Sequence, residues 1–121
     1  MQLTRRHTMK RASEFAMVRA EGSSEAGRFL VLNLARKPDA GAATQPSSFG
    51  IITTKRLGHA VVRNLLRRRM REILREHGEP ISRGFNVVLV LRHRAVFADY
   101  ARLEAEFLKL LRRHLHRQES C

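Results

Sequence analysis

The sequence has almost no cysteine and no long hydrophobic run. Its one cysteine is Cys121, so neither an intramolecular disulfide nor a cysteine-based zinc site can form within one chain. No apolar run approaches the roughly 18 residues that a membrane-spanning helix needs. The charged stretch MQLTRRHTMKR is not followed by the apolar segment of a secretory signal. These absences predict a cytoplasmic protein with no membrane partner.

Acidic residues are also scarce and scattered. Asp39 and Asp99 are the only aspartates, and nothing in the sequence groups the carboxylates that metal-dependent phosphodiester cleavage needs. The six histidines show no ligand spacing, and His114 and His116, two apart on an expected helix, are expected to be exposed. There is no glycine-rich phosphate loop and no nucleophile-base-acid arrangement. We therefore predict no catalytic residue, no metal site and no cofactor bound by the protein alone.

Positive charge is what the sequence has in excess. Lys and Arg total 24 against 11 Asp and Glu, which gives a formal net charge of +13. Such a charge favours a polyanionic partner, nucleic acid first and an anionic membrane surface second. The charge is also concentrated, because residues 55–75, KRLGHAVVRNLLRRRMREILR, hold eight Lys or Arg residues and one acid. This concentration indicates a binding surface.

Hydrophobic periodicity predicts a single domain over residues 1–121 with the element order α-β-β-α-β-α. Helices are expected over 8–21, 59–77 and 99–117, and strands over 28–37, 48–55 and 85–92, with one short extra strand possible. The first two strands are expected to pair antiparallel across a flexible loop at 38–48. The third should be central, because its apolar run does not alternate. This order predicts an α/β (α+β) fold with helices packed on one central sheet.

The predicted helix over 59–77 has two faces. At about 100° per residue, an apolar arc that includes Leu66, Met70 and Ile73 faces the core. The opposite face collects Asn64, Arg67, Arg68, Arg71 and Arg75. About 16 helical residues span roughly 24 Å, and planar guanidinium groups can bind phosphate oxygens through two hydrogen bonds. This face could therefore follow several phosphates of a structured nucleic acid.

Two observations bear on whether this charged face binds a partner or is merely solvated. A solvated helix face normally mixes charges of both signs, whereas here only Glu72 opposes the arginines. Lys55 and Arg56 extend the basic surface before the helix, and Gly58 is expected to turn the chain there. Arg69 breaks the pattern and is expected either to extend its charged head outward to solvent or to lie at the edge of the core. Binding is the favoured interpretation.

The basic stretch also follows a pattern of fixed spacing. Its members are Lys55, Arg56, Gly58, Ala60, Val61, Arg63, Asn64, Arg67, Arg68, Arg71 and Glu72. The pattern resembles the signature of the bacterial ribonuclease P protein subunit. Further likenesses are Glu14-Phe15 followed by Gly22, then Phe29, and Gly84-Phe85-Asn86. The resemblance covers nearly the whole chain, and it implies a two-layer α/β sandwich of the ribonuclease P protein or ribosomal protein domain 2-like type, with an unusual left-handed crossover.

The resemblance implies a subunit of the endoribonuclease ribonuclease P, in which an RNA subunit with Mg²⁺ removes the 5′ leader of precursor tRNA. The protein would assist this cleavage and broaden the substrate range, without an obligate protein partner. The residues implied for binding the RNA subunit are Lys55, Arg56, Arg63, Asn64, Arg67, Arg68, Arg71 and Arg75. Those implied for the leader, in a cleft between the first helix and the sheet, are Lys10, Arg11, Phe15, Arg19 and Phe29. There a base could stack on an aromatic ring.

The chain departs from the family pattern at two positions. Leu65 stands where the third residue of an Arg-Asn-Arg triplet is usual, and His59 stands where an asparagine is usual. The main alternative is a ribosomal or general structured-RNA-binding protein without an associated nuclease activity. A cationic helix on a membrane surface and a DNA-reading helix are weaker alternatives. For Phe15 and Phe29, an ordinary place in the core is the alternative to base stacking.

Overall fold

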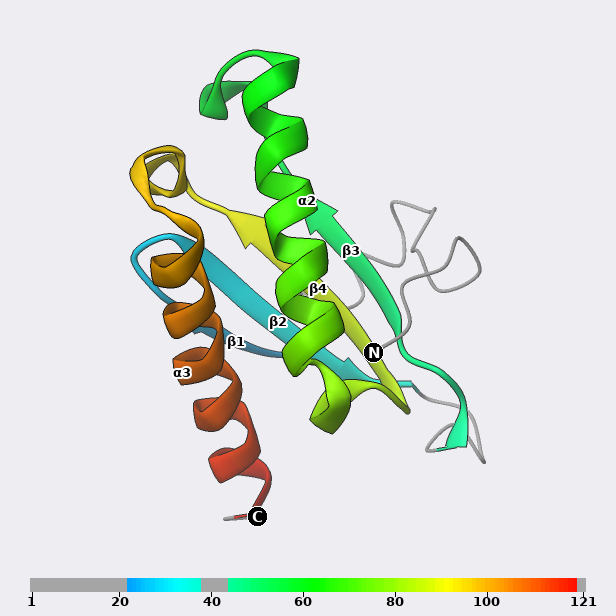
Figure 1. Cartoon of the computed structure of the whole chain (residues 1–121). Helices are drawn as coiled ribbons and strands as arrows, with labels where there is room; N and C mark the ends of the chain where they lie inside the picture. The colour runs from blue at the N-terminus through cyan, green and yellow to red at the C-terminus, as the bar shows by residue number, and fades with distance from the viewer. Residues whose placement is uncertain (1–21, 38–43, 120–121) are drawn as a thin grey trace.

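The computed structural model describes residues 22–37 and 44–119, and in this part of the chain four strands form one sheet beneath two long helices (Figure 1). The strands are β1 (Ser23–Ala26), β2 (Leu30–Arg36), β3 (Ser48–Ile52) and β4 (Phe85–Leu91). The helices are α2 (Ala60–His77) and α3 (Tyr100–Glu119), with short 3-10 turns η3 (Lys55–Leu57), η4 (Glu79–Ile81) and η5 (His93–Phe97). The predicted α/β class is confirmed, and β1 is the short extra strand. The helix predicted over 8–21 and most of the predicted loop lie outside the described residues.

β4 lies in the interior of the sheet, as its sequence predicts. The strand order is β1-β2-β4-β3, with β2 antiparallel to β1 and β4, and β3 parallel to β4. The expected antiparallel pairing of the strands over 28–37 and 48–55 is therefore wrong, because β4 lies between them. The physical reason is that β4 is apolar on both faces. Val87 and Leu89 belong to the main core and Val88 is fully buried among a second set of residues, which suits β4 to an interior position.

β3, α2 and β4 form a parallel crossover unit. Leu57 of η3 is buried, and Gly58 turns the chain into α2 with a φ of 123°, a conformation that side-chain-bearing residues rarely adopt. In Figure 1, α2 lies in front of the sheet and both strands point upward, with β4 to the left of β3. The connection is therefore left-handed, which confirms the crossover implied by the family resemblance.

The main core lies between the sheet and the two helices. Leu30, Leu32 and Leu34 alternate along β2 and share one side of the strand, because every second residue of a strand points the same way. In register with Leu32, Leu89 of β4 faces the same core. The helices contribute Leu66, Met70, Ile73, Leu74, Leu103, Phe107, Leu110 and Leu111. The apolar arc predicted for the 59–77 helix is confirmed. No helix in the described ranges is long and apolar enough to cross a membrane.

His114 of α3 is buried in this core, which corrects the expectation that it would be exposed. It follows Phe107, Leu110 and Leu111 on the inner stripe of the helix and retains only 1% of its accessible surface. Its Nε2 donates to the carbonyl of Leu32 at 2.8 Å, and its Nδ1 accepts from the Ser23 hydroxyl at 2.7 Å. A carbonyl can only accept, so these partners select the tautomer with the proton on Nε2. His114 therefore joins α3 to β1 and β2, while His116 is exposed as predicted.

Burial lowers the pKa of His114, although its hydrogen bond to Leu32 opposes the shift. The unfolded chain, with a histidine pKa of about 6.5, should then bind more protons than the folded chain just below that pH. The free energy of unfolding should be highest above about pH 6.5 and should fall as pH decreases toward the lower folded pKa.

Denaturant unfolding between about pH 5 and 7.5 tests this expectation. A His114→Gln variant should show a shallower decline toward acid pH than the unsubstituted chain. A His116→Gln variant serves as the matched control and should keep the full decline. An NMR titration that places the pKa of His114 at or above the usual histidine value would contradict the expectation.

Candidate nucleic-acid interface

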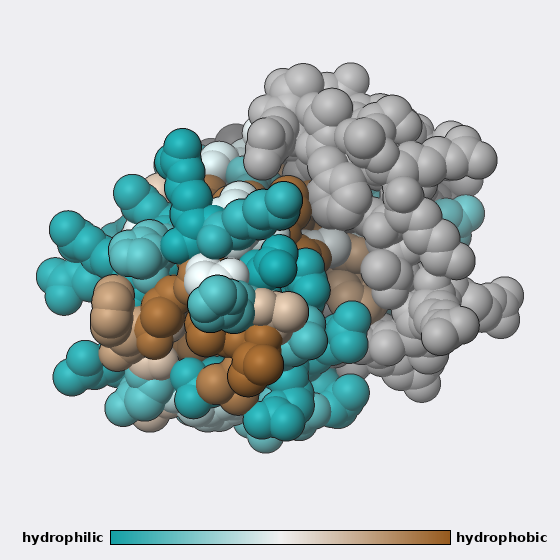
Figure 2. All heavy atoms as spheres, turned by 90° about the horizontal axis from the view of Figure 1, so that it is seen from above, coloured by the Kyte–Doolittle hydropathy of each residue, from teal (hydrophilic) through white to brown (hydrophobic). Residues whose placement is uncertain are grey.

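The predicted basic face of α2 points away from the sheet. Asn64, Arg68 and Arg71 are exposed, and half-buried Arg67 donates from Nη1 to Oδ1 of Asn64 at 3.4 Å. Lys55 and Arg56 are exposed on η3, directly before the helix. Figure 2 looks onto the end of the molecule where α2 begins and shows hydrophilic side chains over much of its visible surface. The structure therefore brings most of the predicted RNA-subunit residues onto one surface.

Two members of the predicted set differ from the others. Arg63 is half-buried, and its Nε is buried without a hydrogen-bond partner among the described residues. Arg75 is exposed but forms an ion pair with Glu72, three residues earlier on the helix. Leu65 is half-buried, in keeping with its expected place beside the core. The cations best placed for an external anion are those on η3 and in the middle of α2.

Arg69 confirms the expectation for the one basic residue on the wrong side of the helix. It is half-buried, and its Nη1 donates to the carbonyl of Ala98 at 3.1 Å. Ala98 is buried in the segment between η5 and α3. Arg69 therefore ties α2 to that segment and does not add to the exposed basic face.

Only one residue of the predicted leader set, Phe29, is described. Lys10, Arg11, Phe15 and Arg19 lie outside the described residues. Phe29 is half-buried and packs against the main core. It also lines a cleft of about 710 Å³ along α3. Phe29 therefore has a packing role in the core, and its stacking role stays a prediction.

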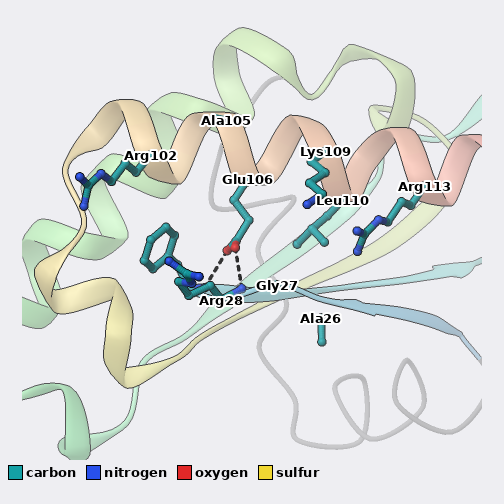
Figure 3. A pocket seen from close by; sticks show the side chains of 10 residues that line it. Ala26, Gly27, Arg28, Arg102, Ala105, Glu106, Lys109, Leu110 and Arg113 are labelled. Carbon is teal, nitrogen blue, oxygen red and sulfur yellow. Dashed lines mark hydrogen bonds between the residues drawn. The ribbon is translucent and has the colours of Figure 1, made fainter.

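Glu106 holds the β1–β2 turn to α3, an arrangement that the sequence does not reveal. Its carboxylate accepts the backbone N–H groups of Arg28 at 2.6 Å, Phe29 at 2.8 Å and Leu30 at 2.9 Å. Figure 3 shows the Glu106 side chain reaching from α3 to the turn. A Cβ at Gly27 would collide with this carboxyl group. A side chain at position 27 would therefore displace the Glu106 carboxyl group from its hydrogen bonds with the turn.

A second cluster that the sequence does not reveal lies between α2 and α3. Donor atoms of Glu76, His77 and Glu104 all lie within 4.8 Å of one another, and Nε2 of His77 is 2.8 Å from Oε2 of Glu104. Burial, followed by the carboxylates of Glu76, Glu104 and Glu72, raises the pKa of Tyr100. The expectation that the acids stay scattered is wrong here, because helix packing joins residues far apart in sequence. These side chains are of the types that hold divalent cations, but the hydrogen bond between His77 and Glu104 already accounts for their approach.

A helix that carries exposed arginines, preceded by a basic turn and packed on a small sheet, defines a class: compact α/β proteins with an arginine-rich helix face, a surface suited to a polyanion such as structured RNA. The family model described as Ribonuclease P matches residues 3–115, and the chain belongs to this family. Family membership confirms the resemblance seen in the basic stretch. It supports the ribonuclease P interpretation over the ribosomal alternative.

Similar proteins of known sequence and structure agree with this assignment. The ribonuclease P protein component of Gluconacetobacter diazotrophicus is 34% identical over 111 residues, covering 90% of this chain and 91% of that protein. The component of Acidothermus cellulolyticus is 33% identical over 111 residues, covering 92% and 90%. The RNase P protein from Thermotoga maritima superposes with a TM-score of 0.69 at 27% identity, covering 82% of this chain and 89% of that chain. The Staphylococcus aureus protein shares the fold, with a TM-score of 0.76, 23% identity and coverage of 88% and 93%.

Proposed function

We propose that this chain binds the RNA subunit of ribonuclease P and the 5′ leader of precursor tRNA, while the RNA carries the chemistry of leader removal. The observation that supports this most directly is the exposed basic face of α2, in a chain that belongs to the ribonuclease P family. The protein would act in the cytoplasm without an obligate protein partner. Its own side chains would bind and orient RNA and would take no part in bond breaking.

Electrostatics explains what such a subunit contributes. Folding the RNA subunit around its substrate brings phosphates of two RNA molecules together, and a protein of net charge +13 lowers that repulsion. The 18 residues of α2 span roughly 27 Å. Arg68 and Arg71 on this helix could each bind a phosphate with a planar, two-pronged guanidinium group. Counterions released from the RNA would then favour binding.

Mg²⁺ held by the RNA would supply the Lewis-acid chemistry of phosphodiester cleavage. For the leader we propose contacts from Lys10, Arg11, Phe15, Arg19 and Phe29, as the family resemblance implies. Phe29 is the described member, and it lines an open cleft. A base of the leader could stack on an aromatic ring while its phosphates meet the cations.

A binding experiment separates this function from general RNA binding. The protein is titrated with the ribonuclease P RNA of its own organism and with a ribosomal RNA fragment of equal length, at the same salt concentration. We expect the ribonuclease P RNA to bind at least about tenfold more tightly, a difference of roughly 1.4 kcal/mol. Equal affinity for the two RNAs would support the general RNA-binding alternative and contradict the proposal.

A further inference from the structure

Two adjoining clefts beside the β1–β2 turn carry a second concentration of positive charge. The larger cleft, of about 710 Å³, runs along α3, where Arg102, Lys109 and Arg113 line it (Figure 3). The smaller cleft, of about 350 Å³, is lined by Arg28, Arg92, His93 and Arg94. Arg28 lines both clefts. Together they form one basic surface that does not include the arginine face of α2.

Most cations of this surface have no acidic partner in the part of the chain that the structure describes. Within residues 22–37 and 44–119, no carboxylate forms an ion pair with Arg28, Arg94, Arg102 or Lys109. The acid that does line the larger cleft, Glu106, already accepts three backbone N–H groups. Its carboxylate is thus engaged by the turn. Uncompensated cations in a concave surface attract an external anion strongly.

This surface is continuous with the basic start of α2. Nδ1 of His93 donates to the carbonyl of Arg56 at 3.1 Å, which joins η5 to η3. Nη1 of Arg92 donates to the carbonyl of Gly27 at 2.8 Å, which joins the start of η5 to the β1–β2 turn. The basic surface therefore extends from Lys55 and Arg56, through η5, to the β1–β2 turn and α3.

An exposed aromatic ring borders the smaller cleft. Phe97 is 76% exposed, and its ring lies edge-on to His93 with centroids 5.7 Å apart. Figure 2 shows a hydrophobic patch among hydrophilic side chains at this end of the molecule. This phenylalanine leaves most of its surface open to solvent. Its ring provides a face on which an unpaired base can stack, and cations beside the ring would add to the binding free energy by contacting the phosphates of the same nucleotides.

We propose that the two clefts form a second docking surface for the phosphate backbone of the ribonuclease P RNA subunit, with Phe97 stacking on one of its unpaired bases. This inference rests on the proposed function, because the same RNA would extend around the start of α2 to the two clefts. The continuity with Arg56 favours the RNA subunit over the precursor tRNA as the occupant.

The test compares two double variants of equal charge. Arg28→Gln with Lys109→Gln removes one cation at the junction of the clefts and one along α3. Arg36→Gln with Arg112→Gln removes two exposed cations that line neither cleft. For the RNA subunit, the slope of log affinity against log salt should become shallower by about 1.4 to 1.8 in the first variant, and should change by much less in the second. Circular dichroism confirms that both variants are folded.

Three outcomes decide the inference. Equal slopes for the two double variants would overturn it. The proposed function would still stand in that case if an Arg68→Ala, Arg71→Ala variant lost affinity for the RNA subunit. A slope change seen with precursor tRNA alone, and not with the RNA subunit, would assign the surface to the substrate and also overturn it. A Phe97→Ala variant should weaken binding at least about fivefold, and unchanged affinity would remove the stacking contact from the proposal.

Discussion

Replacing Arg68 and Arg71 by alanine is expected to weaken binding of the ribonuclease P RNA about 30-fold. Both side chains are exposed on α2, so each can contact a phosphate without rearrangement. An exposed charge contact contributes about 1 kcal/mol, and two such losses correspond to about 30-fold in Kd. The salt dependence should become shallower by about 0.7 to 0.9 per contact. Filter binding over a series of salt concentrations measures both quantities.

The matched control for this prediction is the Arg36→Ala, Arg112→Ala variant, which loses the same charge from other parts of the surface. Its affinity should fall far less, because only long-range attraction is reduced. If the Arg68→Ala, Arg71→Ala variant kept the salt dependence of the unsubstituted chain, these two arginines would face solvent in the complex. The assignment of the α2 face as the RNA-binding surface would then be wrong.

The largest loss of stability is expected on replacing Glu106 by alanine. The carboxylate accepts three backbone N–H groups of residues 28–30, and the alanine variant leaves them without that acceptor. Hydrogen bonds to charged groups contribute about 1.5 to 3 kcal/mol each, with partial compensation by water at the exposed end. We expect a decrease in the free energy of unfolding of about 2 to 4 kcal/mol, measured by denaturant titration. Glu104→Ala, on the same helix, is the control and should cost less because it removes fewer bonds.

Gly27 provides an independent check on this arrangement. Alanine at position 27 would collide with the Glu106 carboxyl group and displace it from the turn. Gly27→Ala should therefore be costly alone but much less so in the Glu106→Ala background, where the colliding group is gone. A double-mutant cycle measures this coupling. Strictly additive costs would show that the carboxylate does not occupy this place in solution.

Patterns local in sequence predicted most of the described elements. The apolar arc of α2 and the interior position of β4 follow from periodicity and from a non-alternating apolar run. The partner of β3 could not be predicted in the same way, because periodicity assigns strands without stating which edges pair. β4 pairs with β2 along one edge and with β3 along the other. The expected antiparallel pair of β2 and β3 is therefore replaced by a parallel pair of β3 and β4.

In the candidate site too, local sequence patterns predicted some features, while others arise only from tertiary packing. Charge of one sign along α2 predicted the exposed face, and helical spacing predicted that Arg69 lies apart from it, at the edge of the core. The expected exposure of His114 is wrong because this residue follows Leu110 by four positions and so lies on the inner stripe of α3. The Glu76, His77 and Glu104 cluster, and the basic clefts around Arg28, arise from tertiary packing. No local pattern encodes such meetings of distant segments.

The most direct test of the central claim is cleavage of precursor tRNA by the RNA subunit, with and without this protein, across a range of Mg²⁺ concentrations and leader lengths. At low Mg²⁺ the protein should greatly increase cleavage at the mature 5′ end, because its cations reduce the repulsion that Mg²⁺ would otherwise screen. The increase should diminish as Mg²⁺ rises. If the RNA alone cleaved equally well at every Mg²⁺ concentration and leader length, the protein would not be a functional subunit of this ribonuclease P.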